Sequence, residues 1–572
     1  MKQQLELAVA QVVRDTLGID TTVALTRPEE QFGDYATNVA LQLAKQLGRP
    51  PRQIAEELAE TMRAELGDQA SEVSVAGPGF INIRLNDTVL KAELGKMLDG
   101  GQTYGRSERY QGQVIVAEYS DPNPFKVLHA GHLYTSVMGD AIANLFQAAG
   151  GEVHRVNFGG DVGMHVGKTL WAILQKLGGP HPEKLSDIPA DKHAEWMAAA
   201  YVEGNNAYDD DKAARAEMVS LNKQVYTFHT EDDHDSPLAQ IYWTCRQWSY
   251  DYFNEFYARI GTKFEKYYPE SGVADLGLKT VQEHVGDVFQ ESDGAVIFKG
   301  EAHGLHTRVF VNSQGIPTYE AKDVGLIMQK WADYHFDRSI IITGDDQLQY
   351  MQVVLKAIEQ FAPDLARRST HLTHGIVKLG GGTKMSSRKG NILRAVDVLD
   401  AAAEANKQAT GKEDMAVVLG AVKYAFLRQR MGGGDIIYDP EESVSLQGNS
   451  GPYLQYAHAR ACSILRKADA QAPVATSVDS DTSAVDLTAG ERTLARKLGE
   501  YPEVVDLAIN ELMPHHICTY LYELAQTFNR FYENNRVIGD EREQERLLLV
   551  TAYKNILASG LVLLGISAPE AM

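Results

Sequence analysis

Two short segments, far apart in the sequence, constrain the fold of this chain more than any other feature. The first is His129-Ala130-Gly131-His132, and the second is Lys384-Met385-Ser386-Ser387-Arg388. Each comes after a strand-like apolar stretch, and the first also opens an apolar helix-like stretch. Together, in this order, they predict a nucleotide site that is gripped from both sides of a parallel α/β sheet.

Length and composition indicate an ordinary globular protein with several domains. The chain has 572 residues, of which 44% are hydrophobic and 23% charged, so it has room for three or four domains. No apolar run of 18 residues stands out and the N-terminus lacks a signal-peptide core, so we expect a cytoplasmic protein without a membrane span. Three widely separated cysteines predict buried thiols rather than a disulfide or zinc framework: Cys245, Cys462 and Cys518.

The net charge argues against nonspecific binding to nucleic acid. There are 55 Lys and Arg residues against 77 Asp and Glu residues, so the formal charge is −22. A polyanion is repelled by such a chain unless a local basic groove exists. Any role in RNA binding must therefore rest on motifs.

The pattern of apolar residues divides the chain into four parts. Residues 1–105 predict a small α+β domain, with helices over Val39–Leu47 and Pro51–Leu66 and a strand over Gly79–Leu85. Residues 106–395 predict a Rossmann-type doubly wound parallel sheet, interrupted by a helical insertion at about 170–300. The elements expected in this second part are strands at 114–119, 153–158, 339–343 and 374–379, and helices at 131–149 and 347–361.

The last two parts are expected to be helical. Residues 396–470 predict a helical linking region, and a polar linker covers 471–490. Residues 491–572 show only helical periodicity, which predicts an all-α bundle. Acidic runs in the insertion, at 209–211 and 231–235, are more typical of a solvated surface than of a metal site, so no metal site within the protein is expected.

The histidine segment has the chemistry of a phosphate site. The N-terminus of a helix offers free N–H groups and the positive end of its dipole. His129 and His132 are three residues apart and can face phosphates from one side, while Gly131 lets a base approach the backbone. The alternative is two surface histidines beside a turn. Lys384, Met385, Ser386 and Ser387 would close over polyphosphate, or would be a solvated basic loop.

Both segments together resemble the signature motifs of class I aminoacyl-tRNA synthetases, and their flanks are similar to the arginyl-tRNA synthetases. The resemblance covers nearly the whole chain and is loose only at 170–300. The stretches that carry it are Glu118–His132, Val156–Gly163, Pro317–Asp323, Gly448–Arg460, Phe32–Asn38 and Tyr520–Asn529.

The resemblance implies a two-step reaction. Arginine and ATP would give arginyl-adenylate and pyrophosphate, and arginine would then pass to the 3′ end of tRNA(Arg). Because the arginine carboxylate attacks phosphorus directly, catalysis would consist of positioning and charge stabilisation, with Mg²⁺ bound to the ATP phosphates. The residues expected at the nucleotide are His129, His132, Gly131, Gly160, Asp161, Gly344, Gln347, Lys384, Met385, Ser386 and Ser387.

One position departs from the family pattern. The general class motif has lysine where this chain has Ser387. In such arginyl enzymes a lysine just upstream of the histidine motif is thought to substitute. Lys126 stands at that place, three residues before His129, and we expect it to share this role with Lys384.

The substrate side of the site needs anions, since a guanidinium group prefers planar acceptors. The resemblance implies that Glu118, Tyr319 and Asp323 recognise the guanidinium group. Ser120 and Asn123 would hold the main chain of the amino acid. Of the C-terminal aromatic residues, most should be helix core and one or two should stack on anticodon bases: Tyr520, Tyr522, Phe528, Phe531 and Tyr532.

Three other functions remain open at this point. A class I synthetase for a neutral amino acid would leave the anions at 118 and 323 unpaired. A tRNA-binding protein without catalysis would not need the histidine pair, and a nucleotidylyltransferase would not need the N-terminal unit or the helical tail. The expected protein is a monomer whose partners are tRNA(Arg), arginine and ATP, with no membrane partner.

Overall fold

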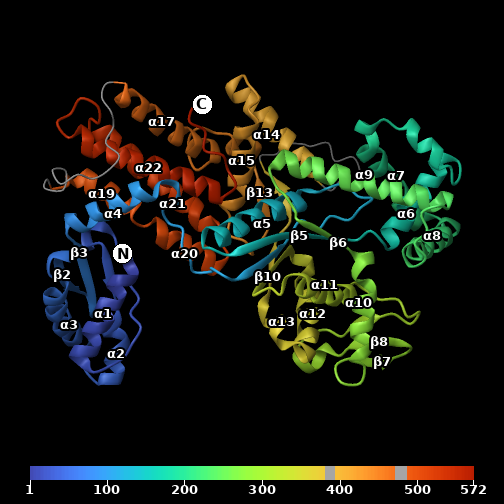
Figure 1. Ribbon diagram of the computed structural model, residues 1–572, viewed down its shortest axis with the longest axis horizontal. Helices are drawn as coiled ribbons and strands as arrows, with labels where there is room; N and C mark the ends of the chain where they lie inside the picture. The colour runs from blue at the N-terminus through green and yellow to red at the C-terminus, as the bar shows by residue number, and fades with distance from the viewer. Residues whose placement is uncertain (381–392, 471–485) are drawn as a thin grey trace.

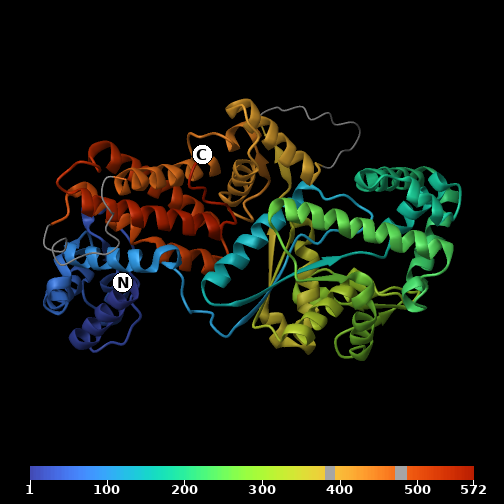
Figure 2. The same cartoon turned by 45° about the horizontal axis from the view of Figure 1, so that its top comes forward.

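The molecule is elongated, with the N-terminal unit at one end and helices α7 and α8 at the other (Figure 1). The computed structural model describes residues 1–380, 393–470 and 486–572. The expected site residues Lys384, Met385, Ser386 and Ser387 lie outside the described residues. A central parallel sheet separates the two ends, and the C-terminal helices lie between this sheet and the N-terminal unit (Figures 1 and 2).

The N-terminal unit is an antiparallel sheet of three strands, in the order β1-β3-β2, packed against helices. The helices expected over Val39–Leu47 and Pro51–Leu66 occur with those bounds, and the expected strand at 79–85 is β3. The elements are α1 (Lys2–Leu17), β1 (Tyr35–Thr37), α2 (Val39–Leu47), α3 (Pro51–Leu66), β2 (Ala70–Ala76), β3 (Phe80–Leu85) and α4 (Asp87–Gly100).

The central sheet confirms the predicted doubly wound fold. All five strands are parallel, in the order β11-β10-β4-β5-β6. The chain runs outward from β4 to β6 on one side and from β10 to β11 on the other, so the switch point lies between β4 and β10. The strands are β4 (Val114–Glu118), β5 (Glu152–Gly159), β6 (Lys266–Pro269), β10 (Arg338–Gly344) and β11 (Ser369–His374).

The two faces of the sheet pack against different helices because successive side chains in a strand point to opposite sides. Ile115 and Ile340 join a core with α5 and the C-terminal helices, whereas Val116 and Ile341 join a core with α10, α11 and α12. The helices next to the sheet are α5 (Ala130–Ala148), α9 (Pro237–Ile260), α10 (Glu270–Glu283), α11 (Tyr319–Tyr334), α12 (Leu348–Phe361) and α13 (Pro363–Arg368). Helix α6 (Met164–Leu177) follows β5 and packs against α7 and α8.

The range 170–300, expected to be a helical insertion, is mostly helical, with helices as far as Ile260 and then α10 at Glu270–Glu283. It also contains β6, which is a strand of the main sheet, and a small antiparallel sheet begins near its end. The residues of β6 include a lysine and a proline and form no apolar run, so periodicity does not reveal this strand. The remaining elements here are α7 (His193–Asp210), α8 (Lys212–Thr230), β7 (Gln290–Ser292), β8 (Ala295–Phe298) and β9 (Arg308–Val311).

The prediction of a single strand over 374–379 is wrong. The main-sheet strand β11 ends at His374, and a separate short strand, β12, begins at Val377 and pairs in parallel with β13. This region then continues through helices as expected. Its elements are β12 (Val377–Leu379), α14 (Ala395–Thr410), α15 (Met415–Leu427), β13 (Ile436–Tyr438), α16 (Pro440–Ser443) and α17 (Gly451–Asp469).

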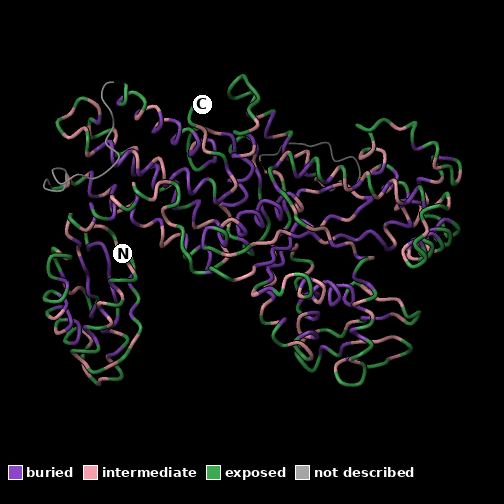
Figure 3. Tube along the Cα trace, viewed as in Figure 1, coloured by how far each residue is buried: buried purple, intermediate pink, exposed green. Residues whose placement is uncertain are grey.

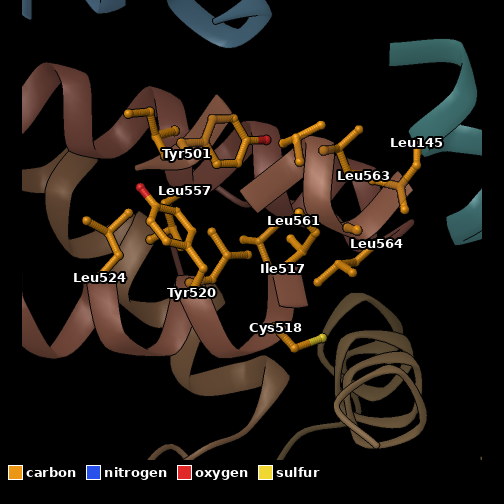
Figure 4. Close-up of a cluster of buried hydrophobic side chains, with 14 of the residues drawn as sticks. Leu145, Tyr501, Ile517, Cys518, Tyr520, Leu524, Leu557, Leu561, Leu563 and Leu564 are labelled. Carbon is orange, nitrogen blue, oxygen red and sulfur yellow. The ribbon is translucent and has the colours of Figure 1, made fainter. Parts of the chain in front are cut away.

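The described C-terminal part is helical, as predicted, and it packs directly on α5. Burial is concentrated in these helices and in the central sheet (Figure 3). Leu145 of α5 meets Leu563 and Leu564 in one apolar cluster (Figure 4). The helices are α19 (Ala489–Leu498), α20 (Tyr501–Glu511), α21 (His515–Asn534) and α22 (Glu543–Leu563).

Helix α22 is long and apolar enough to cross a membrane by length and composition alone. However, 78% of its most apolar window is buried inside the protein. This burial is typical of the core helix of a helical bundle. The three cysteines are also buried and free, as expected.

Candidate active site

The histidine segment forms the first turn of α5, at the carboxyl end of β4. His129 is the N-cap, and its Nδ1 accepts hydrogen bonds from the backbone N–H groups of Gly131, at 3.1 Å, and His132, at 3.4 Å. In return, the backbone N–H of His129 donates to Nδ1 of His132 at 3.0 Å. This reciprocal capping fixes both rings, which stack with centroids 3.6 Å apart.

The capping bonds also fix where each ring carries its hydrogen. A neutral imidazole has one donor and one acceptor nitrogen, and here Nδ1 is the acceptor in both rings. Each ring therefore carries its hydrogen on Nε2. Burial, followed by the charges of His374 and Lys126, lowers the pKa of His129 to about 4. Burial likewise holds the pKa of His132 well below its usual range, so both rings are neutral donors at pH 7.

The loop between β4 and α5 holds a strained backbone. Ser120, Asp121 and Phe125 have φ angles of 74°, 51° and 66°, in the left-handed region that residues other than glycine rarely adopt. Such strain is concentrated at functional sites, where surrounding contacts maintain it. The two prolines of this loop and the buried ring of Phe125 leave the segment little freedom.

Two segments separated by more than 250 residues in the sequence meet beside the histidines. The backbone of Leu128–Ala130 runs antiparallel to that of Leu393–Ala395, with Ala130 N donating to Leu393 O at 2.7 Å and Ala395 N donating to Leu128 O at 2.9 Å. Leu393, which follows the second signature segment in the sequence, therefore lies beside the histidine segment. The structure thus brings together the described flank of one segment and the whole of the other.

The carboxyl ends of β10 and β11 form the wall opposite α5. A Cβ atom placed on Gly131 would lie 3.7 Å from the ring of His374, which ends β11. Gly344 ends β10, and a Cβ there would lie 2.6 Å from Oδ1 of Asp346. Gln347 follows in the turn before α12 and donates to Asp346 at 3.2 Å. Gly131, Gly344 and Gln347 therefore all lie at the switch point.

Below this wall lies a group of buried acidic and basic side chains, which we call the acidic cluster: Glu118, Asp121, Glu270, Asp323, Lys322 and Lys330. Each of the two lysines forms an ion pair with a glutamate. Lys330 donates to Glu118, and Lys322 donates to Glu270 at 2.7 Å. Among the described residues, no cation lies within ion-pair distance of Asp121 or Asp323. The cluster therefore holds two more carboxyl groups than ammonium groups.

The two carboxyl groups without a cationic partner, Asp121 and Asp323, both have raised pKa values. Burial, with the nearby charge of Glu118, holds the pKa of Asp121 well above its usual range. Burial also raises the pKa of Asp323 to about 8, although a hydrogen bond from the hydroxyl of Tyr350 opposes this. A cation placed among these groups would restore both carboxylates to the ionised form.

The carboxylate of Glu118, which the resemblance places at the guanidinium group, already has a cationic partner within the protein. Its side chain is 3% exposed, and its partner Lys330 is 0% exposed, so the ion pair is sealed inside the protein. Lys330 also donates to Ser339 Oγ at 3.1 Å. The carboxylate is therefore already neutralised by the chain itself.

Ser120 and Asn123, which are expected to hold the main chain of the amino acid, belong to the strained loop itself. Asn123 Oδ1 accepts from Gly160 N at 2.7 Å, and a Cβ on Gly160 would lie 2.7 Å from Glu270 Oε1. Glycine is thus required at position 160 by the close approach of these two side chains. The Ser120 hydroxyl is bonded to the Tyr257 hydroxyl at 2.7 Å.

Both carboxylate oxygens of Asp161 accept hydrogen bonds from other residues of the protein. It is fully buried, and Oδ2 accepts from Arg246 at 3.0 Å and from the hydroxyl of Ser271 at 2.7 Å, while Oδ1 accepts from Ser271 N at 3.0 Å. Both oxygens are thus used within the protein. These partners come from α9 and α10, and the expected role of Asp161 at the nucleotide stays a prediction.

Tyr319 and Asp323 both belong to α11, but they differ in environment. Tyr319, the first residue of the helix, is 56% exposed, whereas Asp323, one turn later, is buried. The Tyr319 hydroxyl lies 3.8 Å from the position of a Cβ on Gly163. Tyr319 is therefore accessible from solvent, whereas Asp323 on the same helix is not.

Sequence reasoning missed several residues of the site. Glu270, Lys322, Lys330, Tyr350 and His374 come from four different elements and have no local pattern that marks them. Only Lys322 falls within a stretch that carries the family resemblance. Among the described residues, no group of three or more His, Cys, Asp and Glu side chains is arranged to hold a metal ion.

The C-terminal aromatic residues are mostly core, as expected. Tyr520, Phe528 and Phe531 are buried in the helical bundle. Tyr522 and Tyr532 are half-buried, and the Arg460 guanidinium lies 4.8 Å from the ring centroid of Tyr532. These two tyrosines are the members of the group with surface available to a ligand.

Three family models together match most of the chain. Residues 93–442 match the family model described as tRNA synthetases class I (R), catalytic domain. Residues 1–85 match the arginyl tRNA synthetase N terminal domain, and residues 454–572 match the DALR anticodon binding domain. The chain belongs to the arginyl-tRNA synthetase family.

Relatives of this arginyl-tRNA synthetase family member match over almost their full length. An arginine–tRNA ligase of Clostridium perfringens is 30% identical over 561 residues, which covers 95% of each chain. One from Synechococcus is 32% identical over 590 residues, 96% of this chain and 95% of the relative. The solved Thermus thermophilus arginyl-tRNA synthetase has a TM-score of 0.79 at 26% identity and covers both chains completely. The Plasmodium falciparum enzyme, at 20% identity and a TM-score of 0.80, shares the fold and covers 100% of this chain and 99% of its own.

Proposed function

We propose that this chain is an arginine–tRNA ligase that forms arginyl-adenylate from arginine and ATP and then transfers arginine to the 3′ end of tRNA(Arg). Family membership supports both the reaction and the amino acid. The observation that carries the amino-acid specificity is the surplus of two carboxyl groups in the acidic cluster. A neutral amino acid would leave that surplus uncompensated, whereas a guanidinium group would neutralise it.

Arginine would enter with its guanidinium group directed at Asp323 and past Tyr319. A planar guanidinium donates two parallel hydrogen bonds to a carboxylate, which a lysine ammonium cannot reproduce. Glu118 would act at one remove, because its ion pair with Lys330 lies beside Asp323. Ser120 and Asn123 would hold the amino-acid main chain near Gly160.

ATP would lie at the switch point between β4 and β10. The Nε2–H groups of His129 and His132 would donate to the phosphates as charge moves onto the leaving pyrophosphate. Gly131 would leave room for the base, and Gly344 and Gln347 would lie at the ribose. Lys126 would add a positive charge to the phosphates, together with Lys384, Met385, Ser386 and Ser387 of the second signature segment.

Mg²⁺ would arrive with the phosphates and screen their charge. The carboxylate of arginine attacks the α-phosphorus in line, and no side chain of the protein forms a bond to the substrate. The work of the protein is to bring the two substrates together and to stabilise developing charge. A neutral histidine that carries its hydrogen on Nε2 can donate one hydrogen bond to a phosphate oxygen.

The second substrate, tRNA(Arg), would contact the helical C-terminal part through a few exposed side chains, among them Tyr522 and Tyr532. We further propose that the enzyme works in the cytoplasm as a monomer. Light scattering after gel filtration, at concentrations used for kinetics, would test the oligomeric state.

The decisive experiment is the charging of total tRNA with each labelled amino acid in turn, with ATP and Mg²⁺ present. Transfer of arginine alone is expected. Transfer of a neutral amino acid would contradict the role of the acidic cluster. Binding of tRNA without transfer of any amino acid would instead favour a tRNA-binding protein without catalysis.

A further inference from the structure

The ammonium group of Lys126 has an unusual environment for a half-buried lysine. It lies in the strained loop, three residues before His129, and its charge helps to lower the pKa of both histidines. Among the described residues, no carboxylate lies within ion-pair distance of it. The charge of the Glu270 carboxylate acts on this ammonium group, and Nζ lies 5.3 Å from the ring centroid of Tyr201.

Tyr201 belongs to α7, within the part of the chain that matches the catalytic-domain family model. Helix α7 is held tightly against α6 because Gly204 allows close approach, since a Cβ there would lie 2.1 Å from Lys168 O. Tyr201 lies three residues before Gly204 and so shares its face. Lys168 is bound in turn by Asn205, at 2.9 Å, and lies 3.9 Å from the ring centroid of Tyr208.

We propose that Tyr201 is a positioning residue for ATP binding, whose ring holds the Lys126 ammonium beside the two histidines by a cation–π contact. This inference rests on the proposed role of Lys126 at the phosphates. It gives helix α7, whose function the sequence does not reveal, a direct part in the nucleotide site.

The chemistry of the contact explains why an aromatic ring suits this place. A carboxylate partner would fix the lysine but would also neutralise it and occupy its hydrogens. A ring face attracts the cation through its quadrupole and leaves the N–H donors available to phosphate oxygens. A flexible four-carbon side chain would otherwise lose its rotamer freedom only when ATP binds, which weakens binding.

A double-mutant cycle tests the proposal in the full-length enzyme, with the KM for ATP and the KM for arginine measured in the presence of tRNA. Tyr201→Leu, which removes the π face, should raise the KM for ATP about 5- to 30-fold, the range expected for a cation–π contact. The KM for arginine should stay constant. Tyr201→Phe, which keeps the ring, should behave like the natural enzyme. In a Lys126→Met background, Tyr201→Leu should have no further effect.

Helix α7 also supplies a matched control. Tyr208→Leu removes the same kind of contact from the same helix, but it acts on Lys168, so the KM for ATP should be unchanged. Thermal unfolding of each variant reports any general loss of structure. Additive effects of Tyr201→Leu and Lys126→Met, or a Tyr201→Phe variant as impaired as Tyr201→Leu, would overturn the proposal.

A spectroscopic measurement separates this inference from the function on which it rests. Reductive ¹³C-methylation of lysines gives Lys126 an NMR signal, assigned by its absence in Lys126→Arg, that the ring current of Tyr201 should displace. The displacement should vanish in Tyr201→Leu and persist in Tyr201→Phe. If Lys126→Met impairs ATP use but the signal does not respond to Tyr201→Leu, only the role of Tyr201 is wrong. If Lys126→Met leaves the KM for ATP unchanged, the phosphate role of Lys126 fails and the inference fails with it.

Discussion

Lys330 of α11 and Glu118 at the end of β4 form an ion pair that is sealed inside the central sheet, although 212 residues separate them in the sequence. Two charges withdrawn from water in this way lose hydration that only their mutual contact and further hydrogen bonds replace. The pair therefore holds α11, which carries Tyr319 and Asp323, in register with the strand that leads into the strained loop. Removing either partner would leave the other as an unpaired buried charge.

The first prediction concerns this pair. Lys330→Met should lower the free energy of unfolding by about 3–5 kcal/mol, because it leaves a buried carboxylate without a partner. The double variant Glu118→Leu with Lys330→Met should recover most of that loss. Denaturant unfolding measures both. Lys266→Met, which removes a partly exposed pair with Asp333, is the control and should cost less than about 1 kcal/mol; an equal loss in Lys266→Met would refute the argument from burial.

The second prediction is a pH dependence of arginine binding. Asp323 has a pKa of about 8 in the free enzyme, and a guanidinium group requires the ionised form. Arginine must therefore displace a proton below pH 8, and its affinity should fall about tenfold per pH unit from pH 8 toward pH 6. Isothermal titration in buffers of different ionisation enthalpy should show the proton release, and a flat affinity over this range would contradict the assignment.

The same carboxyl group should affect stability with a defined sign. Its pKa is raised in the folded state above the unfolded value, so the folded state binds the proton more tightly. The free energy of unfolding of the ligand-free enzyme should therefore fall as the pH rises from about 4 to about 8. Asp323→Asn should flatten that part of the profile. Asp323→Ala should raise the KM for arginine far more than the KM for ATP.

The third prediction separates the two nitrogens of His132. Asparagine can replace Nδ1 as the acceptor that caps α5, but it has no donor at the place of Nε2. His132→Asn should therefore keep its stability yet form adenylate about 10²–10³-fold more slowly, as expected on loss of a transition-state donor. His132→Gln, which reaches toward the Nε2 position, should lose less. Binding of tRNA should be unaffected in both, and unchanged adenylate formation in His132→Asn would remove this ring from the phosphates.

Much of the fold, but less of the site, was predictable from the sequence. Helix α5 and the helices over Val39–Leu47 and Pro51–Leu66 are strongly periodic, and strand β4 is a buried apolar run; the bounds of all four agree within a residue. Strands β6 and β12 have four and three residues, too few for a period to emerge. Their place depends on pairing with strands distant in the sequence.

The site shows the same division. The capping by His129 and His132 is local, so the sequence places both rings at the start of α5. The resemblance implies a role for Glu118 at the guanidinium group. Its ion pair with Lys330 could not be predicted, because no motif marks Lys330. Asp161 belongs to a segment that carries the family resemblance, yet its partners are Arg246 and Ser271, which no local pattern connects to it.

The fourth prediction concerns the contact between α5 and the C-terminal helices. Leu145→Ala removes a buried side chain where α5 meets Leu563 and Leu564 and should cost about 2–5 kcal/mol of stability. Leu507→Ala, on an exposed face of α20, is the matched control and should change stability little. Thermal unfolding monitored by circular dichroism compares the two. Similar shifts for both variants would show that the contact contributes no special stability.

Helix α5 belongs to two parts of the molecule at once. Its first turn presents the histidines, and its last turns are covered by α22, whose end is bound by Asn144 of α5 and by Lys423 of α15. Removing the C-terminal helices would leave an apolar stripe of α5 facing water. A catalytic fragment cut at the family-model boundary would therefore aggregate rather than dissolve, and a chimaera that exchanges C-terminal domains between relatives would need matching side chains on α5.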